Sequence, residues 1–393
     1  MQRRYWIEAL TFFSYAFFAF SWVSGSFMMP DIMTSFAIEK ISDVTWATNA
    51  VSIAKIIGNF LAASILMFFG MKKAFLGASL LIAAGFFGAL AENYAVFVLS
   101  RLVMGLGGAI LFVYFNPIVV RYFTPSERPV INGINSAPFA FGAFLAVMFT
   151  PSLLAAFGAW QTVLLALSAC SLALLVAALF ILEDFSLTPG TPGSTATDKA
   201  YTMAEGLRDP INWILPFSYS GMLFLYLAVF SLFPLAPGFA VSVSSLATVY
   251  IASGLAGSIG GAMAVKRFSR RLPVIRYSGL FVALCAGVML YTDSPALAYA
   301  MACVSGFLMF FPVPAMYTLV QELPGMSTGR ITLIFSMFWS FSYVISGILM
   351  YMAGIIADAT GSVTVAVFFA AACPVTFFIG TFVLPETGCP PEA

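Results

Sequence analysis

Lys55 and Arg101 are the charged side chains that lie well inside long apolar runs of this sequence. Lys55 stands about ten residues into the run 45–69, which at about 1.5 Å per residue is near the middle of a membrane. Arg101 stands nearer the start of the run 95–121. Charged groups at membrane depth are costly and by default functional, and these two would bind an anion. The 16 acidic residues, Glu8 among them, all fall in loops or near the ends of runs, so none is predicted to neutralise Lys55.

Lys55 belongs to a polar stripe along one helical face. The stripe consists of Thr48, Ser52, Lys55 and Asn59. Its 4-3-4 spacing keeps the four side chains within an arc of roughly 60°, at about 100° per residue. A second stripe, in the run 329–354, consists of Thr332, Ser336, Trp339, Tyr343 and Ser346. We expect both stripes to face a wet cavity between two halves of the protein, where transporter sites usually lie.

Prolines inside two further runs free backbone groups and permit bending. They are Pro216 and Pro234 in the run 211–236, and Pro312 and Pro314 in the run 295–319. Tyr219, Tyr226 and Tyr317 lie nearby and are candidates for lining the cavity. The predicted substrate-binding set is Lys55, Arg101, Ser52, Asn59, Thr48, Ser336, Trp339, Tyr343, Tyr219 and Tyr317.

Each of these residues also has a purely structural interpretation. Lys55 could bond carbonyls exposed by a break in a neighbouring helix. Isolated Ser and Asn side chains, such as Asn132 and Ser136, often bond across helices. Any one of the 42 Phe residues more often packs against lipid or a neighbouring helix than against a ligand.

The elements that must position these residues are long apolar helices. The chain is 61% hydrophobic and 8% charged, whereas roughly a quarter of a soluble domain is charged. A run of roughly 20 apolar residues spans a membrane as a helix. The runs are 6–29, 45–69, 74–91, 95–121, 130–154, 160–182, 211–236, 245–265, 273–291, 295–319, 329–354 and 362–384. We therefore predict an all-α integral membrane protein with twelve transmembrane helices.

The runs form two groups of six. We predict an N-terminal six-helix bundle over 1–182, a linker rich in Pro, Gly and Thr over 183–210, and a C-terminal six-helix bundle over 211–393. A basic turn follows the second run and recurs after the eighth, which indicates a duplicated unit. Of the 17 Lys and Arg residues, 14 fall in alternate loops, which predicts that both termini and the linker are cytoplasmic.

Two sequence motifs carry a resemblance to a known family. Residues 101–109 read RLVMGLGGA, which resembles the R-x-x-x-G-x-G motif of the major facilitator superfamily, and residues 123–128 resemble the loop that follows it there. The superfamily's loop motif, G-x-L-A-D-R-x-G-R-R, is only partly kept. Met67 and Lys266 occupy its acidic position in the two halves, which removes the acid-to-cation latch that this motif provides. The resemblance implies a secondary transporter with the superfamily's fold. It also implies that Arg101 could serve structure or coupling, whatever the substrate is.

Several function classes are not supported by the sequence. It has no GxxxxGK[ST] motif, no His, and five Cys without paired spacing, so we predict no enzyme, no cofactor and no metal site. The net charge of +1 gives no argument for nucleic-acid binding. The first run is too long for a cleaved signal peptide.

We therefore hypothesise a transporter of a small anion, either an organic carboxylate or an inorganic ion, held by Lys55 with help from Arg101. In this respect the chain is similar to the superfamily's nitrate, cyanate and oxalate–formate porters. Transport would be proton symport or anion exchange, by a monomer in the lipid of a prokaryotic inner membrane. Two alternatives stay open: an exporter of apolar or cationic drugs, and a non-transporting membrane sensor or scaffold.

Overall fold

The structure is a computed structural model that describes residues 2–38, 46–184, 201–233, 236 and 239–388. Every regular element in these ranges is a helix, and twelve spans are long and apolar enough to cross a membrane, as predicted. Most of the predicted linker 183–210 lies outside the described residues. Its last part contains the short helix α11 (Met203–Arg208).

Contacts divide the chain into two compact units. Unit 1 comprises Met1–Phe123, Pro138–Thr202 and Ser327–Ser340, and unit 2 comprises Thr124–Ala137, Met203–Met326 and Phe341–Ala393. Each unit thus includes one short segment from the part of the sequence predicted to form the other half. The halves 1–182 and 211–393 themselves stay a prediction.

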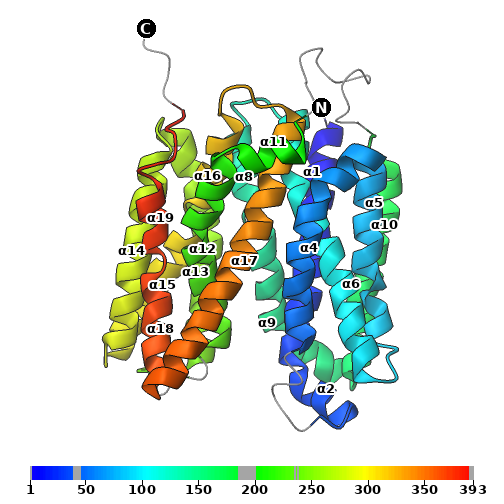
Figure 1. Cartoon of the computed structure of the whole chain (residues 1–393). Helices are drawn as coiled ribbons and strands as arrows, with labels where there is room; N and C mark the ends of the chain where they lie inside the picture. Colours follow the sequence, from blue (N-terminus) through cyan, green and yellow to red (C-terminus); the bar gives the residue numbers. More distant parts are fainter. Residues whose placement is uncertain (1, 39–45, 185–200, 234–235, 237–238, 389–393) are drawn as a thin grey trace. The chain divides into compact units, whose positions relative to one another are not determined.

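The helices of both units are drawn in Figure 1. Unit 1 contains α1 (Gln2–Phe27), α2 (Met29–Ser35), α4 (Trp46–Phe69), α5 (Met71–Ala83), η1 (Ala84–Gly88), α6 (Tyr94–Val113), α7 (Phe115–Tyr122), α9 (Pro138–Phe157), α10 (Trp160–Ile181) and the first part of α17 (Thr328–Thr360). Unit 2 contains α8 (Arg128–Asn135), α11, α12 (Ile211–Ser231), α13 (Val243–Arg267), α14 (Leu272–Tyr291), α15 (Pro295–Phe310), α16 (Val313–Gln321), the remainder of α17, α18 (Val363–Ala372) and α19 (Val375–Gly380).

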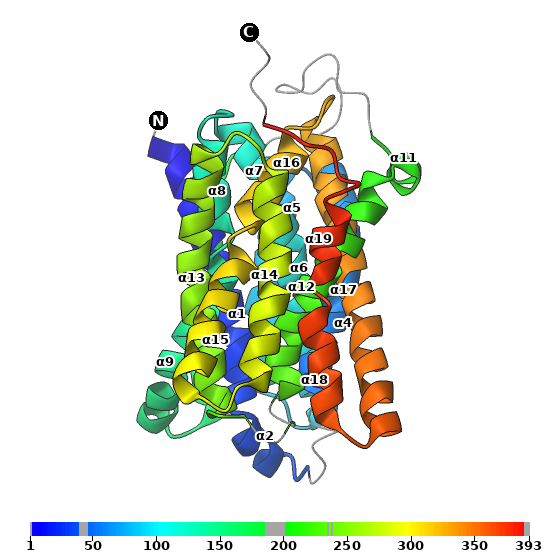
Figure 2. The ribbon, with the colours of Figure 1, turned by 90° about the vertical axis from the view of Figure 1, so that its left-hand side faces the viewer.

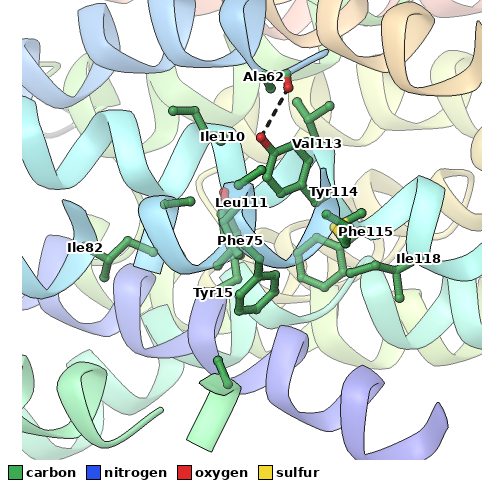
Figure 3. Close-up of a cluster of buried hydrophobic side chains, with 14 of the residues drawn as sticks. Tyr15, Ala62, Phe75, Ile82, Ile110, Leu111, Val113, Tyr114, Phe115 and Ile118 are labelled. Carbon is green, nitrogen blue, oxygen red and sulfur yellow. Dashed lines mark hydrogen bonds between the residues drawn. The ribbon is translucent and has the colours of Figure 1, made fainter. Parts of the chain in front are cut away.

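Several spans are broken into two helices. The tenth span breaks between α15 and α16 at the predicted hinge, where Pro312 and Pro314 remove backbone donors. Pro216, in contrast, lies inside the continuous helix α12. Pro234 lies outside the described residues. The fourth span breaks at Tyr114, whose hydroxyl donates a 3.2 Å hydrogen bond to the Ala62 carbonyl of α4 (Figure 3).

Two turns of the structure support the predicted duplication. At the start of α5, the Lys72 backbone N–H donates to Oδ1 of Asp184 at 3.2 Å. At the start of α14, the Arg271 and Leu272 N–H groups donate to Oε1 of Glu386 at 2.7 and 3.1 Å. In both cases the carboxylate follows the last of six consecutive spans, and it caps the start of the third of those spans. The helix dipole favours negative charge at that end of a helix.

Glycines allow close helix packing. In unit 2, α13 runs along α15 (Figure 2). A Cβ atom on Gly257 would collide with the backbone carbonyl oxygen of Phe307, which cannot move aside as a flexible side chain would. In unit 1, a Cβ on Gly58 of α4 would lie 2.9 Å from the Leu106 carbonyl oxygen of α6. The α4 and α6 pair, which carries Lys55 and Arg101, is therefore tightly packed.

Replacing Gly257 with Ala should lower the free energy of unfolding by about 1–3 kcal/mol, because the added methyl group overpacks the α13–α15 contact. Gly287→Ala on α14 is the matched control, since a Cβ there meets nothing within 4 Å. That variant should be neutral or slightly stabilising. Thermal unfolding in detergent measures both, and equal effects would contradict the packing argument.

Candidate substrate-binding site

Lys55 lies in the core of unit 1 against two aromatic rings. Its side chain is 4% exposed, and Nζ stands 4.3 Å from the ring centroid of Trp22 in α1 and 5.2 Å from that of Phe139 in α9. Ring faces stabilise a cation without neutralising it. The sequence placed the lysine inside a span but did not predict these rings, because nothing distinguishes Trp22 or Phe139 from the many other aromatic residues.

Arg101 of α6 is buried beside the same helix α1. Nη1 donates to the Ser21 carbonyl oxygen at 3.4 Å, and Cζ lies 4.9 Å from the Phe97 ring centroid. Nε and Nη2 are buried and have no hydrogen-bond acceptor among the described residues. Leaving donors of a charged group unfilled in a dry environment is costly, and an anionic ligand would fill them.

Both cations reach the same turn of α1, since Ser21 and Trp22 are adjacent. One acidic residue occurs within α1, and α4, α6 and α9 contain none. That residue, Glu8, is 5% exposed, so it is more deeply buried than its place near the helix end suggested. It lies fourteen residues before Trp22, about 21 Å along the helix axis. The described residues also contain no group of His, Cys, Asp and Glu that could hold a metal ion.

The two predicted polar stripes meet in unit 1 at Ser336, whereas Tyr343 and Ser346 of the second stripe belong to unit 2. Ser336 Oγ of α17 donates to the backbone carbonyl of Asn59, and Ser340 Oγ donates to that of Ile56 at 3.0 Å. Trp339 packs on Phe112 with ring centroids 4.9 Å apart. These serines therefore bond across helices, which is the structural interpretation of the second stripe. In the first stripe Asn59 is 2% exposed, with no hydrogen-bond partner for Oδ1 in the described part of the chain.

The remaining predicted residues fall in different surroundings. Ser52 is half-buried on α4, and the side chain of Thr48 lies outside the described residues. Tyr219, Tyr317 and Tyr343 belong to unit 2, where their side chains are close enough to interact electrostatically. Tyr219 also packs on Phe377, with ring centroids 5.7 Å apart. The structure thus gathers the three predicted tyrosines into one cluster of that unit.

A buried amide cluster in unit 2 was not predicted as a unit. Asn132 Nδ2 of α8 donates to Thr318 Oγ1 at 3.1 Å and to Gln321 Oε1 at 2.9 Å, and Gln321 Nε2 donates back to Asn132 Oδ1 at 3.3 Å. Asn132 alone was predicted to bond across helices. The cluster ties α8 to α16 with neutral hydrogen bonds.

Asn132→Ala and Gln321→Ala should each destabilise the protein, and the double variant should lose less than the sum of the two. The coupling energy should fall within about 0.5–3 kcal/mol, because the residues share hydrogen bonds. A double-mutant cycle of thermal unfolding in detergent measures it. Asn132→Ala combined with Ser278→Ala, whose hydroxyl bonds within α14, serves as the additive control. Additivity in both pairs would rule out the cluster as a unit.

The loop motif of the second half contains an ion pair despite Lys266 at the acidic position. Arg271, the last residue of the motif, donates from Nη2 to Oε1 of Glu322 at 2.8 Å and from Nε to Oε2 at 3.1 Å. Its Nη1 donates to the Val265 and Phe268 carbonyls at 2.7 Å each. A cationic residue of the loop is therefore fixed by an acid from another span.

The sequence matches the family model of the Major Facilitator Superfamily over residues 11–347. A curated relative, the uncharacterised protein Cj0987c of Campylobacter jejuni, is 25% identical over 232 residues, which cover 59% of this chain and 70% of that protein.

Solved structures of transporters share the fold. FucP in its outward conformation, the fucose:proton symporter of E. coli, gives a TM-score of 0.75 at 17% identity over 98% of this chain and all (100%) of that chain. The human organic anion transporter MFSD10 gives 0.74 at 12% identity, over 98% and 100% of the two chains. The proton:xylose symporter XylE gives 0.74 at 15% identity, over 98% and 96%.

Proposed function

This chain belongs to the major facilitator superfamily, and from that premise we propose that it carries small anions across a membrane. The family makes it a multi-pass secondary transporter that works by alternating access, and not an enzyme. The proposal adds that the transported solute is negatively charged. It rests on one observation: two buried cations, Lys55 and Arg101, lie against one turn of α1, and two donors of Arg101 lack acceptors in the described structure.

Lys55 supplies the charge that attracts the anion, and Arg101 supplies directed donors. A guanidinium presents N–H groups in a planar fork that matches a carboxylate or a similar planar anion. The buried amide of Asn59, one turn from Lys55 on α4, adds a neutral polar group. We assign these three residues to anion binding. The serines of α17 instead fix the surrounding helices.

The same charges determine how the transporter turns over. A site filled by an anion is nearly neutral and passes through an occluded state at low cost, whereas an empty site must move bare positive charge past an apolar gate. We therefore propose exchange of anions or proton-linked entry over return of the empty carrier. The protein acts as a monomer, with a coupling proton or a second anion as its other ligand.

A binding screen of the purified protein tests whether its solute is anionic, neutral or cationic. Sodium salts of nitrate, formate, oxalate and benzoate should raise the melting temperature at constant ionic strength, because a ligand stabilises the folded state by mass action. Fucose, xylose and tetraphenylphosphonium are the neutral and cationic comparisons. Stabilisation by sugars or by the lipophilic cation alone would refute the anion proposal, and the latter would favour a drug exporter.

Alternate loops of the chain contain 14 of the 17 Lys and Arg residues. We place these loops on the cytoplasmic side of a prokaryotic inner membrane, because short cytoplasmic loops carry an excess of Lys and Arg. Labelling of single cysteines in a cysteine-free background tests this orientation. Lys73→Cys, exposed at the start of α5, should be protected from an impermeant thiol reagent in intact cells. Asp293→Cys, exposed between α14 and α15, should be labelled. The reverse pattern would invert the orientation.

A further inference from the structure

Lys55 stands at one end of a continuous row of aromatic rings in unit 1. Successive ring centroids lie 4.9, 4.6, 5.4, 5.9 and 5.5 Å apart along this row. The row, which we call the aromatic belt, consists of Trp339, Phe112, Tyr15, Phe18, Trp22 and Phe139. Its last two rings are the ones that contact the Lys55 ammonium.

The rings of the belt differ in exposure. Tyr15 and Phe18 are fully buried, at 2% and 0% exposure, and form its packed base. Trp22, Phe112 and Phe139 keep part of their surface accessible. Apolar ring surface that stays accessible next to a buried cation can contact the body of a bound molecule, while the cation binds its charged end.

We infer that the anion bound at Lys55 is a monocarboxylate with an apolar body, such as an aromatic or alicyclic acid, and this rests on the proposed function. The carboxylate meets the ammonium, and the ring or chain of the ligand packs on the accessible surface of Trp22, Phe112 and Phe139. Aromatic pairs favour stacked and edge-to-face arrangements, which the belt already uses between Tyr15 and Phe112 and between Trp22 and Phe139. The inference selects one class from the range of anions in the proposed function.

Two other classes of anion would make poor use of this surface. An inorganic ion or formate has no apolar body, so it gains nothing from the belt. A polyhydroxylated acid such as gluconate would press its hydroxyl groups against ring carbons, which form no conventional hydrogen bonds with them, and unpaired buried hydroxyls are costly. A ligand that buries roughly 60 Å² of additional apolar surface should bind about tenfold more tightly.

Binding of four sodium salts to the full-length protein tests this inference. Benzoate and cyclohexanecarboxylate should bind at least about tenfold more tightly than formate and gluconate, as measured by calorimetry. Phe139→Leu and Trp22→Leu should reduce the affinity for benzoate by a larger factor than the affinity for formate, because both anions lose the ring contact of Lys55 but only benzoate also loses apolar surface. Phe87→Leu, in η1 and 54% exposed, is the matched aromatic control and should change neither affinity.

The outcomes separate the inference from the proposed function. If formate or gluconate binds as tightly as benzoate, the apolar class is wrong but anion binding stands. If no anion of the wider screen binds, the proposed function fails and the inference fails with it. If one ring variant does not fold, the other variant and the series of four salts on the unmodified protein still decide the question.

Discussion

Lys55→Gln is expected to weaken binding of the transported anion about 10- to 100-fold. A hydrogen bond to a charged group contributes about 1.5–3 kcal/mol, and each 1.4 kcal/mol is about tenfold in affinity. Gln keeps much of the length of the side chain but removes the charge that Trp22 and Phe139 surround. Calorimetric titration gives the affinity, and flux of the same anion into proteoliposomes should fall with it.

The control for charge is Lys266→Gln, which removes a lysine from the exposed end of α13. Its affinity and flux should stay within about twofold of the unmodified protein, because exposed charges are well screened by solvent and salt. If Lys55→Gln transports every anion at the original rate, Lys55 does not bind cargo. Loss of flux with unchanged affinity would assign Lys55 to the conformational cycle instead.

Arg271→Ala is expected to lower the free energy of unfolding by about 3–5 kcal/mol, the cost of removing one partner of a buried ion pair. The guanidinium is 9% exposed and donates to Glu322 and to the Val265 and Phe268 carbonyls. Its removal leaves the carboxylate of Glu322 and two carbonyls without their donor. Thermal unfolding in detergent should show a fall of several degrees in the melting temperature.

The neighbouring Arg270 provides the matched control, because its side chain is exposed. Arg270→Ala should change the unfolding free energy by less than about 0.5 kcal/mol, as is usual for surface substitutions. Glu322→Gln should destabilise by a smaller amount than Arg271→Ala, since the two carbonyl contacts of the arginine remain. Equal melting temperatures for Arg271→Ala and Arg270→Ala would exclude a stabilising role for the pair.

The sequence was sufficient to predict the spans and the places of Lys55 and Arg101 inside them. Hydropathy identifies a membrane helix because lipid leaves the backbone no partner outside the helix, so the signal is local and strong. The depth of Lys55 in the membrane stays a prediction from its position within the run and from helix geometry. The breaks at proline were also predictable in part: the tenth span breaks at Pro312, whereas α12 continues through Pro216.

The partners of the site residues could not be predicted, because they come from distant parts of the chain. Gln321 lies 189 residues after Asn132, and Glu322 lies 51 residues after Arg271. A polar residue in a span signals that it needs a partner but not which one it finds. The ring contacts of Lys55 are harder still, since in a chain with 42 Phe residues an aromatic side chain carries almost no information about position.

The rings beside Lys55 also affect what happens when cargo leaves. An acidic side chain in their place would compete with each incoming anion, so every round would need to displace it and let it return. Trp22 and Phe139 favour positive charge without carrying a negative charge of their own. Under the proposed function, neither Trp22 nor Phe139 carries a negative charge that an incoming anion would have to displace from these rings.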